Sequence, residues 1–263
     1  MDLGLKNKRA VICGGSKGLG LASAEALAQE GASLFLVSRE EGALKSAAEN
    51  LRSMGSPDVQ WATCDLTSHE SRQQCVDKIL EAWIGADILV HNVGGPKASF
   101  VMETKEEQWH EGFDRLFIPV VHFNSAFIPY MKKAQWGRII TITSLSVIEP
   151  IPMLAISNAL RSASTSLSKS LSDEIAKFGI TVNCVAPGMV QTDRTEDLLN
   201  TRISNSGQSR DDYMAEMLKT IPAGRLGSPK EFGDVVCFLC SDQASYITGS
   251  TICVDGGKRR STY

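Results

Sequence analysis

The stretch RAVICGGSKGLGLASAEALAQEG, residues 9–31, decides the fold. Its opening, RAVIC, predicts a short buried strand, and LASAEALAQEG has the spacing of a helix that ends at a glycine. Between them, GGSKGLG places Gly14, Gly18 and Gly20 in a strand-to-helix turn. Backbone N–H groups and a helix N-terminus meet at such a turn, and glycines permit close approach, so the stretch predicts a pyrophosphate-binding site for a dinucleotide.

Short apolar runs alternate with helical patterns along the rest of the chain. Strands that alternate with helices and are apolar throughout are typical of a parallel sheet covered on both faces. No repeat or composition break marks a second domain, so we expect one α/β domain over 1–263, a doubly wound parallel sheet of the Rossmann type. The further predicted strands are 33–37, 59–64, 87–91, 138–144, 181–186 and 251–255.

Composition and charge narrow the function classes. The 263 residues carry 27 Lys+Arg against 30 Asp+Glu, a net charge of -3. This balance gives no overall attraction to nucleic acid or to an anionic membrane, and no apolar run approaches the roughly 20 residues of a membrane-spanning helix. The seven scattered cysteines predict reduced thiols in the cytoplasm and no metal site. Cys237 and Cys240 form a CxxC without a second ligand pair, so we interpret them as packing residues.

The end of the second predicted strand indicates which dinucleotide is bound. A site selective for NAD places an acidic residue there to bind the ribose 2′-hydroxyl. This chain has Ser38 and Arg39 instead, and Lys17 lies inside the glycine turn. Two cations and a hydroxyl suit a 2′-phosphate, which favours NADP(H). The alternative is that Lys17 and Arg39 are solvated surface charges.

The segment 192–222 differs from its surroundings because it is long and polar. Such excursions in a compact domain often form a lid or a binding loop. A solvated surface insertion is the alternative interpretation.

The whole chain resembles the short-chain dehydrogenase/reductase family, and within it the branch similar to β-ketoacyl-acyl-carrier-protein reductase. Spaced motifs in the right order carry the resemblance; segment 193–222 and GGP at 94–96 resemble a divergent subgroup. The resemblance implies a small-molecule substrate and a homo-oligomer, either a tetramer or a dimer. The motifs are CGGSKGLG (13–20), CDL (64–66), HNVGG (91–95), ITS (142–144), VNCVAPGMVQT (182–192) and RLGSPKEF…ITGSTICVDGG (225–257).

The resemblance also implies a set of cofactor-binding residues in the turn and at the ends of the later strands. Arg161, at the position of the family's lysine, would add hydrogen bonds to the ribose. The others are Ser16 and Leu19 in the turn, Asp65 and Leu66 at the adenine, Asn92, Val93 and Gly94 in the cleft, and Pro187, Gly188 and Thr192 at the nicotinamide end.

The catalytic positions depart from the family pattern, which is an Asn-Ser-Tyr-Lys tetrad. Counting forward from Ser144, the tyrosine position is Ser157 and the lysine position is Arg161, while the asparagine position is Leu116. Only Ser144 is retained. A tyrosine, with a reference pKa of roughly 10, can be tuned by a nearby cation toward working pH, whereas an alkyl hydroxyl is a far weaker acid. Arg161 keeps its charge and cannot relay protons.

Another group would therefore have to supply the proton. Glu149 lies between Ser144 and Ser157 in sequence, at the expected edge of the substrate cavity, and a partly desolvated carboxylate can act as an acid. We include Glu149 with Ser144, Ser157 and Arg161 as candidate catalytic residues. Weaker candidates, for which a packing or surface role is favoured, are His91, His122, Asp212 and Tyr213.

Three functions are compatible with these residues. The first is an NADP(H)-dependent oxidoreductase for a carbonyl/alcohol pair, similar to a 3-oxoacyl reductase, in which water or Glu149 replaces the tyrosine. The second is a lyase, dehydratase or isomerase on the same scaffold, because one binding site can serve different chemistry. The third is a catalytically inactive nucleotide-binding or sensor subunit. We rank them in this order.

Overall fold

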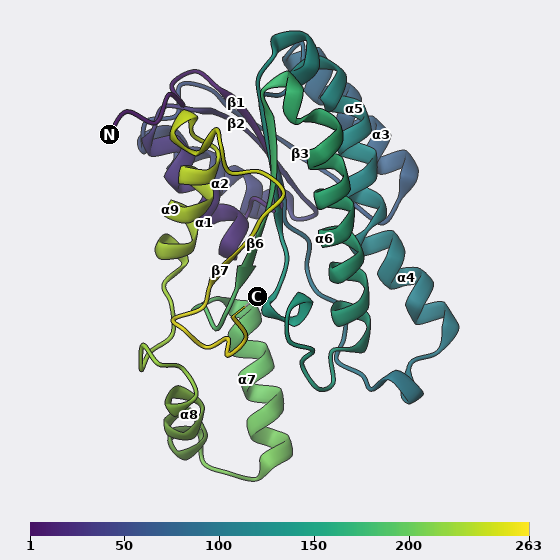
Figure 1. Cartoon of the computed structure of the whole chain (residues 1–263), viewed down its shortest axis with the longest axis vertical. Helices are drawn as coiled ribbons and strands as arrows, with labels where there is room; N and C mark the ends of the chain where they lie inside the picture. The colour runs from purple at the N-terminus through teal and green to yellow at the C-terminus, as the bar shows by residue number, and fades with distance from the viewer. Residues whose placement is uncertain (263) are drawn as a thin grey trace.

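A computed structural model describes residues 1–262, apart from the side chain of Asn205. Seven parallel strands form one sheet in the order β3-β2-β1-β4-β5-β6-β7, which confirms the predicted doubly wound fold (Figure 1). The chain order reverses between β1 and β4, and ligands of such sheets bind beyond the carboxyl ends of the strands at that point. The strands are β1 (Arg9–Cys13), β2 (Ser33–Ser38), β3 (Val59–Thr63), β4 (Ile88–His91), β5 (Gly137–Ile142), β6 (Ile180–Pro187) and β7 (Thr251–Val254).

Helices cover both faces of the sheet and bury two apolar cores. One core packs α1 (Gly18–Gln29), α2 (Glu41–Ser53) and α9 (Pro229–Leu239) against the sheet. The other packs α3 (His69–Ala82), α5 (Ile118–Ala134) and the end of α6 (Ala155–Ile175). Because the central strands are buried on both sides, they carry continuous apolar runs rather than alternating ones.

The predicted helical pattern at 113–131 is divided in the structure. Helix α4 (Glu106–Leu116) ends just before Phe117, and α5 begins at Ile118. Pro119 lies in the first turn of α5, where its missing N–H leaves no helical hydrogen bond unmade. The break therefore falls at the position of the family's asparagine.

The polar segment 192–222 forms two helices rather than a loop. Thr192 caps α7 (Asp193–Ser206) by accepting from the N–H of Thr195, and Ser209 caps α8 (Arg210–Lys219) by accepting from that of Asp212. Both caps place a hydroxyl three residues before its donor, a helix-start signal visible in the sequence. Figure 1 shows α7 and α8 extending from the end of the domain where the strands finish.

No helix within residues 1–262 has the length and apolarity needed to cross a membrane. Cys237 and Cys240 are both buried free thiols, as expected for packing residues. Short 3-10 helices complete the described chain: η1 (Val101–Glu103), η2 (Leu145–Val147), η3 (Ala176–Phe178) and η4 (Asp242–Ala244).

Candidate functional site

The glycine turn after β1 has no room for side chains. Gly14 and Gly18 have positive φ angles of 61° and 58°, which glycine adopts without strain. A Cβ atom on Gly14 would lie 2.6 Å from the carbonyl oxygen of Asn92, and one on Gly20 would collide with the carbonyl oxygen of Gly14. The Asn92 amide donates to that same Gly14 oxygen at 3.3 Å. The turn is thus pinned against the end of β4 and fits the close approach of a pyrophosphate.

The end of β2 joins the same turn through polar side chains. The Ser16 hydroxyl donates to the Ser38 hydroxyl at 2.8 Å, and the Lys17 ammonium lies 3.4 Å from the Glu40 carboxylate. Arg39 is exposed beside them. Sequence reasoning missed Glu40, although its acidic side chain two residues after Ser38 was a visible signal. Glu40 opposes a 2′-phosphate electrostatically, while Lys17 and Arg39 attract one.

Asp65 and Leu66 follow β3 at the expected adenine side. One carboxylate oxygen of Asp65 accepts from the N–H and the hydroxyl of Thr67 at 3.0 and 2.8 Å. These hydrogen bonds lower the pKa of Asp65, with a smaller contribution from Arg39. The carbonyl of Leu66 accepts from Arg72 at 2.6 Å. The loop is therefore held by its own side chains and presents a carboxylate near Arg39.

Ser144 lies just beyond β5 and caps η2. Its hydroxyl oxygen accepts from the N–H of Ser146 at 3.1 Å, which fixes the oxygen and leaves the hydroxyl hydrogen for another partner. The serine is thus positioned to donate a hydrogen bond into the cleft.

Ser157 and Arg161 lie on one face of α6, four residues apart, as predicted. Ser157 is buried, with 6% of its surface exposed. The Arg161 guanidinium donates from Nη1 to the carbonyl of Ile142 and from Nη2 to that of Val93, both at 2.9 Å. Burial, and secondarily the charge of Arg194, lowers the pKa of Arg161 to about 10. Arg161 is therefore a fixed cation at neutral pH that ties the ends of β4 and β5 together.

Leu116 places an apolar side chain at the position where the sequence comparison predicts the family's asparagine. It is 2% exposed, and its carbonyl oxygen accepts from the Ser164 hydroxyl of α6 at 3.2 Å. A leucine side chain offers no hydrogen bond to an ordered water. Leu116 therefore contributes only its backbone carbonyl to hydrogen bonding at this point of the helix.

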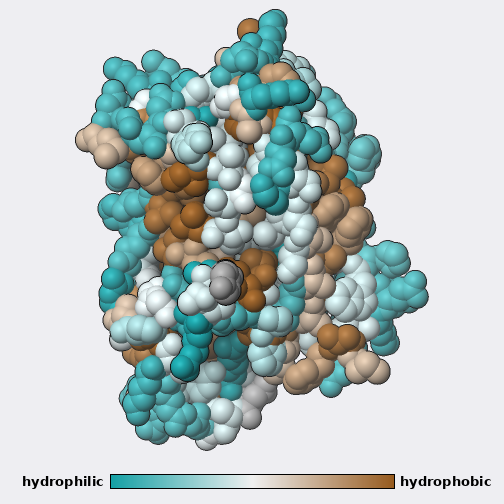
Figure 2. Space-filling model, in the orientation of Figure 1, coloured by the Kyte–Doolittle hydropathy of each residue, from teal (hydrophilic) through white to brown (hydrophobic). Residues whose placement is uncertain are grey.

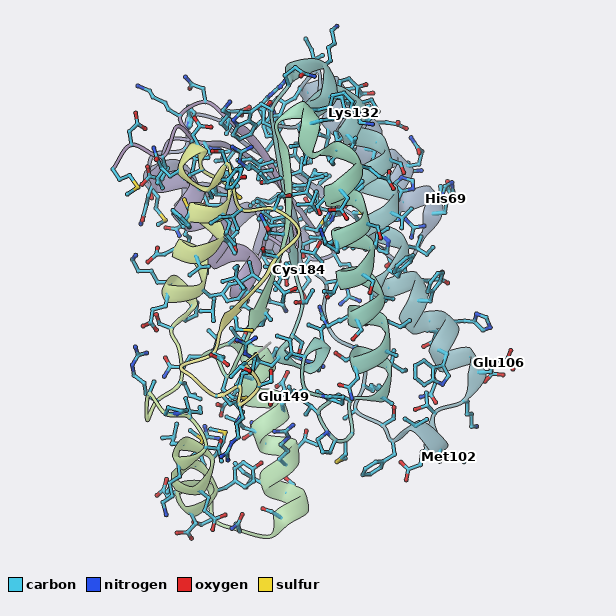
Figure 3. The ribbon with its side chains drawn as sticks, viewed as in Figure 1. His69, Met102, Glu106, Lys132, Glu149 and Cys184 are labelled. Carbon is cyan, nitrogen blue, oxygen red and sulfur yellow. The ribbon has the colours of Figure 1, made fainter. Side chains whose placement is uncertain are left out.

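Glu149, labelled in Figure 3, contacts the C-terminal tail. Its Oε1 accepts from the backbone N–H groups of Arg260 and Ser261 at 3.0 and 2.8 Å. One carboxylate oxygen is thus engaged by backbone donors that a sequence pattern does not reveal. For Glu149 to act as an acid, it would have to work through its other oxygen or release the tail.

The segment after β6 brings α7 to the glycine turn. Gly188 donates its N–H to the carbonyl of Val254 at 2.9 Å, directly after Pro187. A Cβ atom on Gly18 would lie 3.8 Å from Cγ2 of Thr192, so the N-terminus of α7 adjoins the pyrophosphate end of the cleft. Arg194, in the first turn of α7, donates to the carbonyl of Pro96 at 3.0 Å. Sequence reasoning missed Arg194, whose Nη2 would lie 2.8 Å from a Cβ atom on Gly95.

The weaker acid candidates make structural contacts. His91 is buried, its Nε2 lies 2.8 Å from Oδ1 of Asn124, and burial lowers the pKa of His91 to about 4. The Asp212 carboxylate accepts from the hydroxyl of Ser209 at the start of α8. His122 faces α3, and Tyr213 lies on α8. None of these contacts brings the four side chains to Ser144.

Hydrophobic side chains are exposed at the far corner of the domain, around η1. Phe100, Val101 and Met102 are 48%, 63% and 94% exposed, and the Met153 carbonyl accepts from the N–H of Ser99 at 2.8 Å. Figure 2 shows apolar atoms at the surface in this corner, where Figure 3 labels Met102.

Comparison with known proteins agrees with this geometry. A family model described as enoyl-(acyl carrier protein) reductase matches residues 14–259. The 3-oxoacyl-[acyl-carrier-protein] reductase FabG of Chlamydia muridarum is 34% identical over 253 residues, covering 96% of this chain and 98% of that protein. FabG of Escherichia coli K12 is 34% identical over 255 residues, covering 97% of this chain and 98% of that protein.

Solved structures show the same similarity. L-sorbose reductase from Gluconobacter frateurii, in complex with NADPH and L-sorbose, superposes with a TM-score of 0.94 at 32% identity, covering 99% of this chain and all of that one. YwfH, an NADPH-dependent reductase involved in bacilysin biosynthesis, superposes with a TM-score of 0.91 at 27% identity, covering 97% and 100%. Together with the glycine turn and the seven-stranded sheet, these matches show that the chain belongs to the short-chain dehydrogenase/reductase family.

Proposed function

We propose that this protein is an NADPH-dependent reductase of a carbonyl substrate, similar in reaction to the 3-oxoacyl reductases it resembles. The observation that carries the proposal is the glycine turn, which contains Lys17, is pinned to Asn92 and adjoins the end of β2 with Ser38 and Arg39. The solved relatives bound to NADPH support the choice of cofactor. The E. coli and Chlamydia relatives support a 3-oxoacyl substrate, while the sorbose reductase supports a polyol-type ketone.

Each part of the cofactor has residues that would hold it. The turn at Gly14–Gly20 would receive the pyrophosphate, Lys17 and Arg39 the 2′-phosphate, and Asp65 with Leu66 the adenine. Asn92, Val93 and Gly94 would line the cleft, Arg161 would adjoin the ribose, and Pro187, Gly188 and Thr192 would close the nicotinamide end. We further propose that α7 and α8 act as a lid, because Thr192 and Arg194 join α7 to both sides of the cleft.

Ser144 and Arg161 would position the substrate rather than protonate it. NADPH, when bound, supplies the hydride. The Ser144 hydroxyl, fixed by the Ser146 N–H, would donate to the substrate carbonyl oxygen and stabilise its developing negative charge. Arg161 would contribute a fixed positive charge near that oxygen. Ser157 is too weak an acid to supply the proton, which would come from water or from Glu149.

The test begins with calorimetry of NADPH and NADH, followed by NADPH oxidation with a 3-oxoacyl thioester, L-sorbose and simple ketones. We expect tighter binding of NADPH, and turnover of at least one carbonyl that falls about 100-fold in Ser144→Ala. Ser146→Ala is the matched control, because it keeps the backbone N–H that holds Ser144 and removes a hydroxyl with no hydrogen-bond partner within residues 1–262. Equal losses in both variants would contradict the assignment of Ser144.

A second candidate function is nucleotide binding without hydride transfer, whether by a sensor subunit or by a non-redox enzyme. The replacement of the tyrosine by the buried Ser157, and of the asparagine by Leu116, favours it. It predicts tight NADPH binding with no oxidation in the presence of any carbonyl. A non-redox enzyme would form product without a change in NADPH absorbance and would lose activity in Arg161→Ala.

A further inference from the structure

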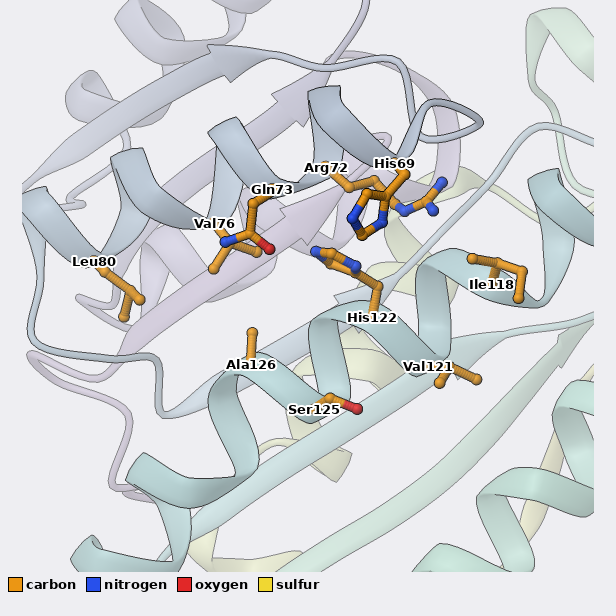
Figure 4. A pocket seen from close by; sticks show the side chains of 10 residues that line it. All are labelled: His69, Arg72, Gln73, Val76, Leu80, Ile118, Val121, His122, Ser125 and Ala126. Atoms are coloured by element: carbon orange, nitrogen blue, oxygen red, sulfur yellow. The ribbon is translucent and has the colours of Figure 1, made fainter.

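A groove of about 520 Å³ lies between α3 and α5, on the helical layer away from the proposed dinucleotide site. Its polar lining comes from His69, Arg72 and Gln73 on α3 and from His122 and Ser125 on α5, with apolar side chains between them (Figure 4). None of these residues takes part in the function proposed above.

Within residues 1–262, Arg72 is a buried cation without a carboxylate partner. Its residue is only 4% exposed. Within the described chain the guanidinium makes one hydrogen bond, from Nη1 to the Leu66 carbonyl, and its buried Nε has no partner. No carboxylate of residues 1–262 forms an ion pair with it. A buried charge is costly unless it is paired, so this arrangement favours an anion as the missing partner.

Further hydrogen-bond donors surround the guanidinium. The rings of His69 and His122 meet edge to face with 5.4 Å between their centres, and Figure 4 shows them facing each other beside Arg72. Burial lowers the pKa of His122, and the charges of Arg72 and His69 lower it further. A neutral imidazole still carries one N–H donor. The nearby carboxylate of Asp77 accepts from Gln73 at 2.9 Å and forms no ion pair with Arg72.

We propose that this groove binds a small oxyanion, either phosphate or a carboxylate, between Arg72 and the paired imidazoles of His69 and His122. The guanidinium Nη2, which makes no hydrogen bond within residues 1–262, would donate to one oxygen of the anion and the imidazole N–H groups to the others. The same guanidinium holds the Leu66 carbonyl, so the site adjoins the adenine-side loop after β3 without overlapping it.

The test measures the melting temperature and the calorimetric Kd for inorganic phosphate and for acetate, against chloride at equal ionic strength. Each titration is run with and without saturating NADPH, because phosphate also competes for the dinucleotide site. We expect phosphate or acetate to stabilise the NADPH-saturated wild type, and Arg72→Met to weaken that Kd at least tenfold. Tighter binding of phosphate would indicate a phosphate site, and tighter binding of acetate would indicate a carboxylate site. Arg52→Met is the matched control, since Arg52 also donates to a backbone carbonyl but is exposed on α2.

An unchanged anion response in Arg72→Met would overturn the proposal, as would the absence of any response in the wild type. If Arg72→Met fails to fold, a crystal of the wild type grown with selenate gives the answer. We expect an anomalous peak whose oxygens lie within hydrogen-bond distance of the Arg72 guanidinium. A peak only elsewhere, or a carboxylate of a second copy of this chain at Arg72, would overturn it. Failure of the wild type to bind NADPH would contradict the proposed function and leave the NADPH-free titrations of this test intact.

Discussion

At the scale of single residues, the predicted site depends on two side chains of α6. Arg161 uses two of its donors on the carbonyls of Ile142 and Val93. If Ser157 and Arg161 occupy the predicted tyrosine and lysine positions, the site has the cation that would lower a tyrosine pKa but a serine in place of the tyrosine. Such a site would keep a positive charge and lack a phenolic proton donor.

Replacing Ser157 by tyrosine should speed up carbonyl reduction, because it supplies a phenolic proton donor. We predict that Ser157→Tyr raises the rate of NADPH oxidation with an accepted carbonyl at least tenfold, because a phenol beside Arg161 is a far stronger acid than an alkyl hydroxyl. The measurement is kcat at saturating carbonyl, and Ser157→Phe is the control that adds the ring without the hydroxyl. A gain in both variants would mean that ring packing, rather than the hydroxyl, limits the rate.

Arg39 and Glu40 should set the choice of cofactor in opposite directions. We predict that Arg39→Ala weakens NADPH binding about tenfold, roughly 1.4 kcal/mol, and leaves NADH binding unchanged, because the side chain serves only the 2′-phosphate. Glu40→Gln should tighten NADPH binding, since it removes a negative charge and frees Lys17. Calorimetry with both dinucleotides checks each variant. Parallel changes for NADPH and NADH would show that neither residue meets the 2′-phosphate.

At the scale of elements, the crossing of α1 and α9 depends on a glycine. A Cβ atom on Gly233 of α9 would collide with the carbonyl oxygen of Ala22 of α1, and Phe232 beside it is fully buried. We predict that Gly233→Ala lowers the free energy of unfolding by about 1–3 kcal/mol, because the two helices must separate to admit the methyl group. Urea unfolding measures the loss.

Gly42 of α2 provides the matched comparison. A Cβ atom there meets nothing within 4 Å, so Gly42→Ala should leave stability unchanged or raise it by up to about 1 kcal/mol through helix propensity. If both variants lose the same stability, the effect of Gly233→Ala comes from the backbone rather than from the helix crossing.

Element positions could be predicted where one local pattern decides them. The bounds of the predicted strands 9–13 and 33–37 agree with those of β1 and β2 to within one residue. These strands could be predicted because buried parallel strands are apolar on both faces. The break at Phe117 was not predicted, since the apolar pattern continues through it and only Pro119 marks the new helix start. The helices of 192–222 were missed for a different reason: their polar composition suggested a loop although Thr192 and Ser209 are ordinary caps.

At the scale of the whole molecule, the sequence could propose candidate site residues but not the partners that the structure gives them. The spacing of Arg161 to Ser157 predicts that both side chains lie on one face of a helix. The hydrogen bond from Arg161 to Val93, in contrast, joins positions 68 residues apart and has no signal in the local sequence. The tail contact of Glu149 and the unpaired Nε of Arg72 likewise arise only when the chain has folded.

Assembly remains a prediction: we expect a homo-oligomer of two or four copies, which light scattering of the purified protein measures. A monomer at micromolar concentration would contradict it.

The stability of the whole domain should fall in mild acid because of His91. Burial lowers the pKa of His91 to about 4, against an ordinary value near 6.5 in the unfolded chain. Between these values the unfolded state binds the proton more readily, so stability is fully present above pH 6.5 and declines as the pH falls toward 4. His122, whose pKa is also lowered by burial, contributes with the same sign. We predict a slope of up to about 1.4 kcal/mol per pH unit from His91, measured by urea unfolding from pH 7 to 4.5.

Two substitutions separate this effect from general acid sensitivity. His91→Gln keeps a side chain that can hydrogen-bond to Asn124 but does not titrate in this window, so it should flatten the slope. His110→Gln changes an exposed histidine on α4 and should leave the slope as in the wild type. If His91→Gln is too unstable to measure, the titration of the His91 ring by NMR in the wild type decides the matter. A midpoint near 6.5 would mean that water reaches the end of β4, and that the acid sensitivity of the fold arises elsewhere.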